Sequence, residues 1–567
     1  MSSMHRIYPP VIPEIESWPI FKLSEDRRNF VAEVEKFTLE RLKLQSTPDI
    51  TDVISKTVFQ ERVRIKEEPW KVDPPKEAQF WRRIRKRLAK YSLDKPDEEA
   101  AVENEELLRL IIHRYAEEIV GTFRKSTFLF ARRFLTFFFN RLLNTAGGSL
   151  FGSKYKLQDR LVVTGYTETV RGLFKKGIVV VTPTHFSNLD SILIGFAMDA
   201  FAGLPSFSYG AGLNLYNTGY TAYFMNRLGA YRVDRRKKNP IYIETLKSMS
   251  NLSIQRGVNS LFFPGGTRSR SGALETKLKM GLLGTAVEAQ RAIFQQGKDT
   301  KIFVVPAILG YHFVLEAPFL IEQHLRQAGK ERYIRSRDDF YSPFQLIKFA
   351  WQFFSQSSEI AVSFGQPMDV LGNPVDADGH SYDKYGNPID VKAYFLNGVE
   401  VNEDLQRESE YTKILADRIV DRYHKDNLVF SSHLTAFAAF QLLKKQHQKL
   451  DLYGILRLPS EEYIFPKETL YDVVDQLQHH LVAMHQEGQI QIAEQIYWSP
   501  EEVVRHGIKH LGAFHVEKPL RFNKSGEIVS DSFHLLFFYH NRLSTFGFEN
   551  RIAWRKRVME EVEAADD

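Results

Sequence analysis

The stretch GIVVVTPTHFSNLD, residues 177–190, carries the strongest indication of the fold. Residues 177–184 are rich in β-branched side chains and carry no charge, which is typical of a strand buried on both faces. His185 follows directly, and Asp190 lies one short turn later. Polar side chains after a buried parallel strand lie at its carboxyl end, where α/β proteins bind ligands. The stretch therefore predicts a candidate site as well as a strand.

Other segments repeat this apolar, β-rich character. They are residues 230–235, 258–264, 301–311 and 359–365, and the helix-like segments 239–255 and 282–296 lie between them. Strands that alternate with helices indicate an α/β domain with a mostly parallel central sheet flanked by helices. We assign a catalytic domain to residues 151–403.

The regions on both sides of this domain are predicted to be helical. Residues 1–150 are charged and punctuated by prolines, and they include a short basic helix at 70–91. Residues 404–567 form a C-terminal domain with apolar-periodic segments at 433–446, 470–488 and 532–543. Together with the β-like residues 488–494, these helices are also compatible with a winged-helix-like unit.

Residues 104–144 have apolar side chains at helical spacing and no proline, which predicts a helix. It is either a membrane-docking helix in a bilayer interface or a core-packing helix whose arginines reach solvent, and the sequence favours neither. Its second half combines aromatic and basic residues: Phe128, Phe130, Phe134, Phe137, Phe138 and Phe139 with Arg132, Arg133 and Arg141.

The composition narrows the classes of function. The chain has 567 residues, with 76 Lys and Arg against 70 Asp and Glu, and no cysteine. The net charge of +6 fits an anionic lipid surface or a phosphorylated substrate. Nucleic acid is the alternative partner. The helix of the winged-helix-like unit that would contact nucleic acid carries Asp472 and Asp475, which argue against this partner. The absence of cysteine excludes disulfides, thiolate catalysis and Cys-ligated zinc.

The sequence contains neither a signal-peptide pattern nor an apolar run long enough to span a bilayer. We therefore expect any membrane association to be peripheral or monotopic, on the cytoplasmic face, without a transmembrane helix. The excess of Lys and Arg is the feature that would attract an anionic leaflet.

His185 and Asp190 have the chemistry of a general base and its orienting carboxylate. A neutral imidazole accepts a proton near physiological pH, and a carboxylate on its other nitrogen fixes the tautomer and stabilises the imidazolium. The short spacing lets a histidine at a strand end meet an aspartate at a helix start. The simpler alternative is a structural histidine in a turn, with Asp190 as the helix N-cap.

Two basic segments overlap the ends of candidate strands, FFPGGTRSRSG at 262–272 and NRLGAYRVDRRKK at 226–238. Glycines allow the backbone to approach a ligand closely, and arginine binds a phosphate through two parallel hydrogen bonds. The alternative is a pair of solvated basic loops. The candidate substrate-binding residues are Arg232, Arg235, Lys238, Gly266, Thr267, Arg268, Ser269 and Arg270.

Taken together, four blocks resemble the glycerolipid acyltransferases: HFSNLD at 185–190, GAYRVDR at 229–235, FPGGTRS at 263–269 and VPAIL at 305–309. The segments RSRSG, LGYHFVLE and LLFFYHNRL resemble the glycerol-3-phosphate acyltransferase branch. The resemblance implies the fold of that family and transfer of an acyl group from acyl-CoA or acyl-carrier protein to the sn-1 hydroxyl of glycerol 3-phosphate. It implies His185 and Asp190 as the catalytic pair, and no metal or organic cofactor.

One residue departs from the family pattern. The third block of the family carries Glu where this chain has Gly265, which leaves open how the site is braced. Glu275, Glu316 and Asp234 are the carboxylates that could take its place.

Other functions stay open beside the one that the resemblance implies. The acceptor could be lysophosphatidate or dihydroxyacetone phosphate, or the chain could be a non-catalytic lipid-binding homologue, an alternative that Gly265 favours and the His185–Asp190 pair disfavours. Ser187 beside the base suggests a covalent serine, but direct transfer needs no acyl-enzyme.

Residues 371–396 contain the related sequences GNPVD and GNPID and are predicted to form a polar surface hairpin. A calcium loop through Asp376, Asp378 and Asp383 is the alternative, and it lacks the usual terminal Glu.

Overall fold

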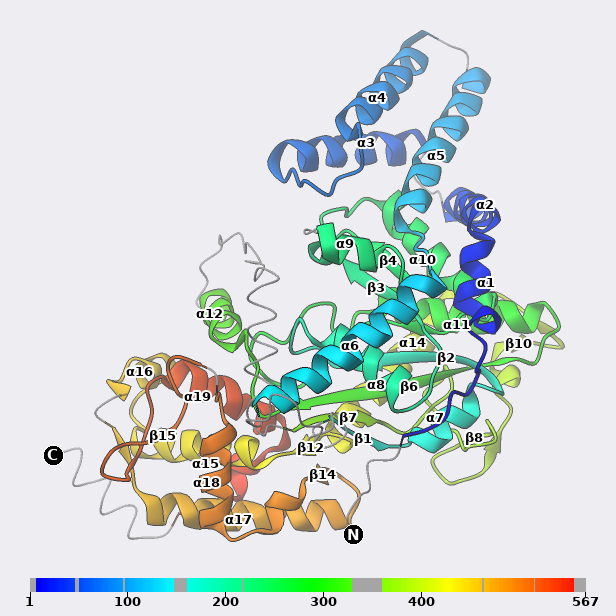
Figure 1. Ribbon diagram of the computed structural model, residues 1–567. Helices are drawn as coiled ribbons and strands as arrows, with labels where there is room; N and C mark the ends of the chain where they lie inside the picture. The colour runs from blue at the N-terminus through cyan, green and yellow to red at the C-terminus, as the bar shows by residue number, and fades with distance from the viewer. Residues whose placement is uncertain are drawn as a thin grey trace.

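The computed structural model describes residues 7–45, 50–94, 97–146, 161–216, 219–328, 359–460, 463–513 and 515–554 (Figure 1). Its centre is a seven-stranded sheet in the order β1–β7–β6–β2–β5–β3–β4. β6 and β7 pair antiparallel, whereas the other neighbouring strands are parallel. The predicted fold class is therefore confirmed. The strands are β1 (Leu161–Gly165), β2 (Gly177–Pro183), β3 (Ser208–Gly212), β4 (Ala230–Val233), β5 (Ser260–Leu261), β6 (Lys301–Tyr311) and β7 (Ile360–Phe364).

The sequence predicted β2, β4, β5, β6 and β7 but missed β1 and β3. β3 reads SYGAG, and its glycines have low β-propensity. Both missed strands are only partly buried, so neither shows the continuous apolar pattern of a central strand.

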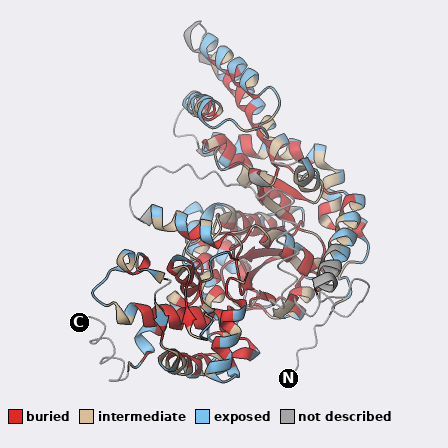
Figure 2. Cartoon of the chain, turned by 60° about the vertical axis from the view of Figure 1, so that its left-hand side comes forward, coloured by how far each residue is buried: buried red, intermediate tan, exposed pale blue. Residues whose placement is uncertain are grey.

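The middle strand β2 is apolar along its whole length because both faces of the sheet are covered. Val179 and Val181 pack into one hydrophobic cluster with α7 (Thr167–Leu173) and α8 (Asp190–Ala200). Ile178 and Val180 pack into another cluster with α11 (Met280–Gln295) and α14 (Leu405–Lys425). Alternate side chains of a strand point to opposite faces, so β2 has no position that faces solvent. Figure 2 shows the central strands as buried.

Four N-terminal helices, α2 to α5, share a hydrophobic cluster with the β4 edge of the sheet. The cluster includes Tyr231 of β4 and Ile241 of α10 (Pro240–Gln255). In Figure 1, α3, α4 and α5 project away from this edge. The basic helix predicted at 70–91 is confirmed from Glu77 onward, where α4 begins, whereas residues 70–76 lie before the helix. The N-terminal helices are η1 (Ile15–Ser17), α1 (Pro19–Glu25), α2 (Arg27–Gln45), α3 (Ile50–Glu67), α4 (Glu77–Asp94), α5 (Asp97–Ile119) and α6 (Lys125–Ala146).

The single helix predicted over residues 104–144 is wrong, because α5 and α6 are separated by residues 120–124. In this interval the chain lies against the segment that leads into β4, and Gly229 N donates a hydrogen bond to Thr122 O at 2.8 Å. Gly121 permits the approach, because a Cβ on it would lie 2.1 Å from Ala230 O. Hydrogen bonds to the sheet edge here replace those of a continuous helix.

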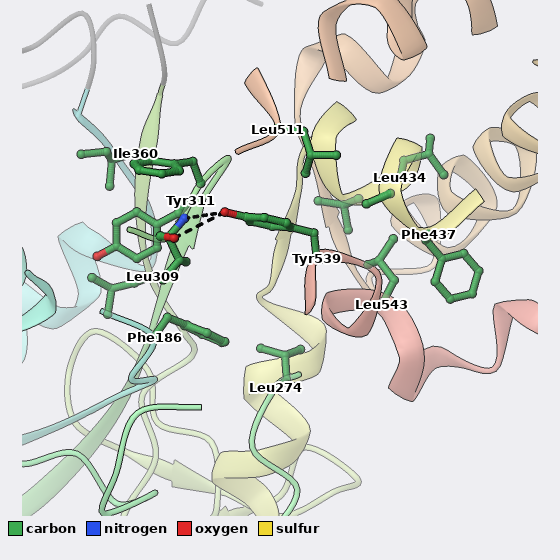
Figure 3. Close-up of a cluster of buried hydrophobic side chains, with 14 of the residues drawn as sticks. Phe186, Leu274, Leu309, Tyr311, Ile360, Leu434, Phe437, Leu511, Tyr539 and Leu543 are labelled. Carbon is green, nitrogen blue, oxygen red and sulfur yellow. Dashed lines mark hydrogen bonds between the residues drawn. The ribbon is translucent and has the colours of Figure 1, made fainter. Parts of the chain in front are cut away.

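The C-terminal helices share the largest hydrophobic cluster with β2, β6 and β7. Tyr539 of α19 (Phe533–His540) accepts a hydrogen bond from Val314 N at 3.1 Å, and Figure 3 shows its ring between the sheet side and the C-terminal helices. This packing brings η7 (Asn541–Phe546) to the end of the sheet where β2 ends. The domain boundaries after residues 150 and 403 stay predictions. The other C-terminal helices are α15 (Ser431–Gln446), α16 (Leu452–Leu456), α17 (Lys467–Gln486), η6 (Glu494–Tyr497), α18 (Pro500–His510) and η8 (Phe548–Arg551).

Small elements complete the described residues. The polar hairpin predicted at 371–396 is confirmed, because β8 (Ser381–Tyr382) pairs antiparallel with β9 (Pro388–Ile389). The winged-helix-like interpretation stays a prediction. Across the described ranges, every helix is too short or too polar to cross a bilayer. The remaining elements are η3 (Leu213–Tyr216), α9 (Gly219–Met225), α12 (Ala317–Ala328), η4 (Val391–Phe395), β10 (Leu396–Asn397), β11 (Glu400–Val401), β12 (Leu428–Val429), β13 (Ile464–Phe465), β14 (Gln491–Ile492), β15 (Arg521–Phe522) and β16 (Ile528–Val529).

Candidate active site

His185 and Asp190 meet in a tight turn at the carboxyl end of β2. His185 Nδ1 lies 2.8 Å from Asp190 Oδ2, which is a hydrogen-bond distance. The same oxygen accepts from the backbone N–H groups of Phe186, at 2.6 Å, and Ser187, at 2.9 Å. Asp190 is the first residue of α8, and Leu189 occupies the N-cap position. The helix start therefore delivers the carboxylate, and the strand end delivers the ring.

Tyr311, at the end of β6, donates from its hydroxyl to Asp190 Oδ1 at 2.6 Å. Burial raises the pKa of Tyr311 well above its ordinary value, and the charge of Asp190 adds to the effect. The phenol therefore keeps its proton and stays a donor. Because both oxygens of Asp190 accept hydrogen bonds, we infer that His185 carries its proton on Nδ1 and that its Nε2 is an acceptor.

The His185 ring is stacked on Phe263, with ring centroids 4.3 Å apart and an interplanar angle of 29°. Phe263 belongs to the loop between β5 and α11, residues 262–279. The His185 side chain is 18% exposed, so its ring is accessible to solvent although most of it is packed. Its orientation is fixed on one side by Asp190 and on the other by an aromatic face.

A cavity of about 680 Å³ opens beside the His185 ring, and we call it the polar cavity. The loops that follow β2, β4 and β5 form much of its wall. It contains several basic side chains, an arrangement that suits a phosphate. Within the described ranges, no three His, Cys, Asp or Glu side chains converge as a metal site requires. The predicted substrate-binding residues that line the polar cavity are Arg235, Gly266, Thr267, Arg268 and Arg270, and Arg236 and Lys279 join them.

Three of the predicted residues lie outside that lining. The Arg232 guanidinium lies over the Tyr216 ring, 4.5 Å from its centroid. Lys238 is exposed. Ser269 N donates to His185 O at 2.7 Å, so this residue ties the β5–α11 loop to the strand end that carries the base.

Arg268 is oriented by a carboxylate beside the His185 turn. Arg268 Nη1 lies 3.4 Å from Glu316 Oε1. Glu316 also accepts from Ser187 Oγ at 3.0 Å and from Asn188 N at 2.8 Å. One carboxylate therefore connects the candidate phosphate-binding arginine to the backbone next to the base.

Sequence reasoning missed Arg542, which reaches the site from η7. Its guanidinium lies 4.3 Å from the centroid of the Phe186 ring, and its Nη2 donates to Leu309 O at 2.9 Å. Burial lowers the pKa of Arg542 to about 10, against the opposing charges of Glu275 and Asp190. Arg542 lies within LLFFYHNRL, but nothing local in that segment indicates that one side chain reaches the end of a distant strand.

A second cavity, of about 150 Å³, lies next to the first and is mostly apolar; we call it the apolar cavity. Side chains of α6 and α8, including Leu135 and Phe196, form much of its wall. Gly195 of α8 also lines it, and a Cβ on this glycine would meet nothing within 4 Å. Ser191, one residue after Asp190, lines both cavities.

α6 combines the two features that its sequence suggested. Its inner face packs: Phe128 lines the apolar cavity, and Arg132 Nε lies 2.7 Å from Asp199 Oδ2 on α8. Its outer face is aromatic, with Phe130, Phe134 and Phe137 exposed to 58%, 48% and 69%. The side chains of Phe138, Phe139 and Arg141 lie outside the described residues.

Comparison with known protein families agrees with this geometry. Residues 160–310 match the family described as Acyltransferase. The chain carries an acyltransferase domain. The matched residues include the His185–Asp190 turn and the loops that form the polar cavity.

Individual proteins that match this chain share only about a quarter of the aligned residues with it. A glycerol-3-phosphate acyltransferase of Pseudomonas putida is 26% identical over 260 residues, which are 46% of this chain and 28% of that protein. The enzyme of the same name from Shewanella loihica is 25% identical over 356 residues, 60% of this chain and 37% of that protein. The one from Shewanella amazonensis is 24% identical over 367 residues, 62% of this chain and 39% of that protein. The chain thus spans well under half the length of these relatives.

Proposed function

We propose that this protein transfers a fatty acyl group from an acyl thioester, acyl-CoA or acyl-carrier protein, to the sn-1 hydroxyl of glycerol 3-phosphate. The observation that carries the proposal is the His185–Asp190 pair at the wall of a basic cavity. A base alone would suit many reactions, but a base beside clustered arginines suits an alcohol that bears a phosphate. The product is lysophosphatidate. The names of the distant relatives support the same acceptor.

In this reaction His185 Nε2 takes the hydroxyl proton as the alcohol oxygen attacks the thioester carbonyl carbon. Asp190 holds the ring and stabilises the imidazolium that forms. When the tetrahedral intermediate collapses, the C–S bond breaks and His185 returns the proton to the leaving thiolate. The products are an ester and a free thiol, and no acyl-enzyme forms. Ser187, whose hydroxyl donates to Glu316, has no part in the transfer.

The two cavities divide the substrates between them. Arg235, Arg268 and Arg270 bind the phosphate in the polar cavity, and holding the acceptor beside His185 makes the attack nearly unimolecular. The first part of the acyl chain enters the apolar cavity. Ser191 borders both cavities, so the thioester carbonyl lies near it, between the two substrates.

Long-chain acyl substrates partition into membranes, so we propose that the protein works as a peripheral or monotopic protein at a membrane surface. The exposed phenylalanines of α6 lie on the helix that also forms a wall of the apolar cavity. Contact of this face with a bilayer would bring the acyl chain to its cavity.

An acceptor-specificity assay tests the proposal. The purified protein is given palmitoyl-CoA or palmitoyl-acyl-carrier protein with labelled glycerol 3-phosphate, lysophosphatidate or dihydroxyacetone phosphate in turn. Glycerol 3-phosphate should give lysophosphatidate at the highest kcat/KM. Preferred use of either other acceptor would move the activity to that step, and transfer to none of the three would contradict acyl transfer to glycerolipids.

A further inference from the structure

Glu275 is a carboxylate of the site to which the proposed reaction gives no role. It lies in the β5–α11 loop, which also carries Arg268. Its Oε1 accepts from the backbone N–H of His185 at 3.0 Å. Its Oε2 is buried, and no hydrogen-bond partner for it is found among the described residues. Burial raises the pKa of Glu275 to about 7, although the His185 N–H and the charge of Arg542 favour the ionised form.

Gly265 faces this carboxylate. A Cβ added to Gly265 would lie 3.1 Å from Cγ and 3.1 Å from Oε1 of Glu275. Gly265 is not among the glycines with positive φ, so its backbone could carry any L-residue. The space beside residue 265, the position where the acyltransferase pattern carries Glu, is therefore already taken by the carboxylate of Glu275.

The other two candidate carboxylates make different contacts. Asp234 Oδ2 pairs with Arg236 Nη2 at 2.7 Å. Glu316 accepts from Ser187 and Arg268. Of the three, Glu275 is the one that both borders Gly265 and binds the backbone of His185.

We propose that Glu275 is a positioning residue that replaces the missing carboxylate of residue 265 and fixes the main chain of the base. Ser269 N donates to His185 O, and His185 N donates to Glu275, so one loop holds His185 by both of its backbone groups. That loop also carries Arg268. The distance between the base and the bound phosphate is thereby set by the loop and its internal carboxylate.

Moving the carboxylate back to residue 265 tests this inference, which rests on the proposed function. Glu275→Ala should lower kcat by about 10²-fold, the cost of misplacing a reacting group by about an ångström, with a smaller change in KM for glycerol 3-phosphate. Gly265→Glu alone should also lower kcat, because two carboxylates then compete for one space.

The double variant Gly265→Glu/Glu275→Ala should regain about 10-fold or more of the lost kcat, because the two changes share one space. Glu275→Gln keeps an oxygen that can accept from His185 N, so it should stay more active than Glu275→Ala. Thr276→Ala, an exposed neighbour, is the matched control and should leave kcat unchanged. A double variant no more active than Glu275→Ala would overturn the inference.

The pH dependence of stability is a second readout, because a side chain that only fills space contributes no pH dependence. An acid whose folded-state pKa lies above its unfolded value holds more protons in the native state, so stability falls as pH rises between the two values. For Glu275 this window runs from 4.5 to about 7. Across it, the Tm of Glu275→Gln should rise relative to that of the wild-type protein, while Thr276→Ala should show no such trend. A constant difference would contradict a buried, titrating carboxylate at this place.

Failure of the proposed function would not leave the inference undecided. If the wild-type protein esterifies none of the acceptors, the acyltransferase proposal fails. The Tm values of the wild type, the two single variants Glu275→Ala and Gly265→Glu and the double variant still show whether residues 265 and 275 share one space. A Tm loss in the double variant that is clearly smaller than the sum of the two single losses supports it, whereas additive losses overturn it.

Discussion

The polar and apolar cavities meet at Ser191, yet they are built in different ways. The polar cavity is formed by loops at strand ends, and its charged side chains are oriented by directional contacts such as Arg268–Glu316. The apolar cavity is lined mostly by apolar side chains of α6 and α8, whose packing is non-directional, and the Arg132–Asp199 ion pair at its wall joins the two helices. The difference teaches that an attacking hydroxyl must be placed by hydrogen bonds and charge, whereas an acyl chain needs only a volume that excludes water.

The largest effect should come from removing the base in the polar cavity. His185→Ala should lower kcat by about 10³-fold, because general-base catalysis contributes about 10²–10⁴-fold. Single-turnover kinetics with labelled glycerol 3-phosphate measures it. The matched control is His380→Ala, because His380 also lies beside an aspartate, with Nδ1 3.3 Å from Asp376 Oδ2, but on the surface hairpin. Equal losses in both variants would refute the role of His185.

A smaller effect should come from an arginine that orients substrate without reacting. Arg268→Ala should raise KM for glycerol 3-phosphate by about 10-fold to 100-fold, since hydrogen bonds to charged groups contribute about 1.5–3 kcal/mol, and should change KM for the acyl thioester little. Arg227→Ala, whose guanidinium lies over the Tyr223 ring, is the control. Arg232→Ala should change KM less than Arg268→Ala, because Arg232 lies outside the cavity lining. An unchanged KM in Arg268→Ala would place the phosphate elsewhere.

The smallest effect separates the two cavities directly. Gly195→Leu fills part of the apolar cavity and should shift preference toward short acyl thioesters by about 10-fold in kcat/KM, the discrimination that a few methylenes give in an apolar pocket. Gly281→Leu is the matched change in the polar cavity, because Gly281 lines that cavity and its added Cβ also meets nothing within 4 Å. It should alter KM for the acceptor and leave chain-length preference unchanged. The same shift in both variants would mean that the cavities do not act separately.

Much of the fold could be predicted because central strands have a recognisable sequence pattern. β2 and β6 are covered on both faces, so their sequences are nearly continuous apolar runs. β3 could not be predicted, because its backbone pairs with neighbours while its glycines contribute little side-chain pattern. The break between α5 and α6 could not be predicted either, because it depends on hydrogen bonds to a sheet edge formed by residues far along the chain.

The candidate site divides in the same way. The sequence placed His185 and Asp190 close together because they are neighbours in the chain, and it found Arg268 and Arg270 because they follow a strand. The sequence could not show that Arg235 lines the polar cavity and Arg232 does not, because this difference depends on how the end of β4 faces the cavity. These residue roles stay predictions until the variants are measured.

By itself, the sequence determined an α/β sheet with a histidine–aspartate turn at one strand end, because local spacing and apolar periodicity fix such features. Only the tertiary structure decided that Tyr311 completes the hydrogen bonding of Asp190, that Arg542 reaches the site and that Glu275 fills the space beside Gly265. The contacts of Tyr311 and Arg542 join segments that are distant along the chain, so they follow from how the sheet and the C-terminal helices pack into one core. Glu275 and Gly265 share one loop, and the path of that loop, which no local pattern encodes, decides their contact.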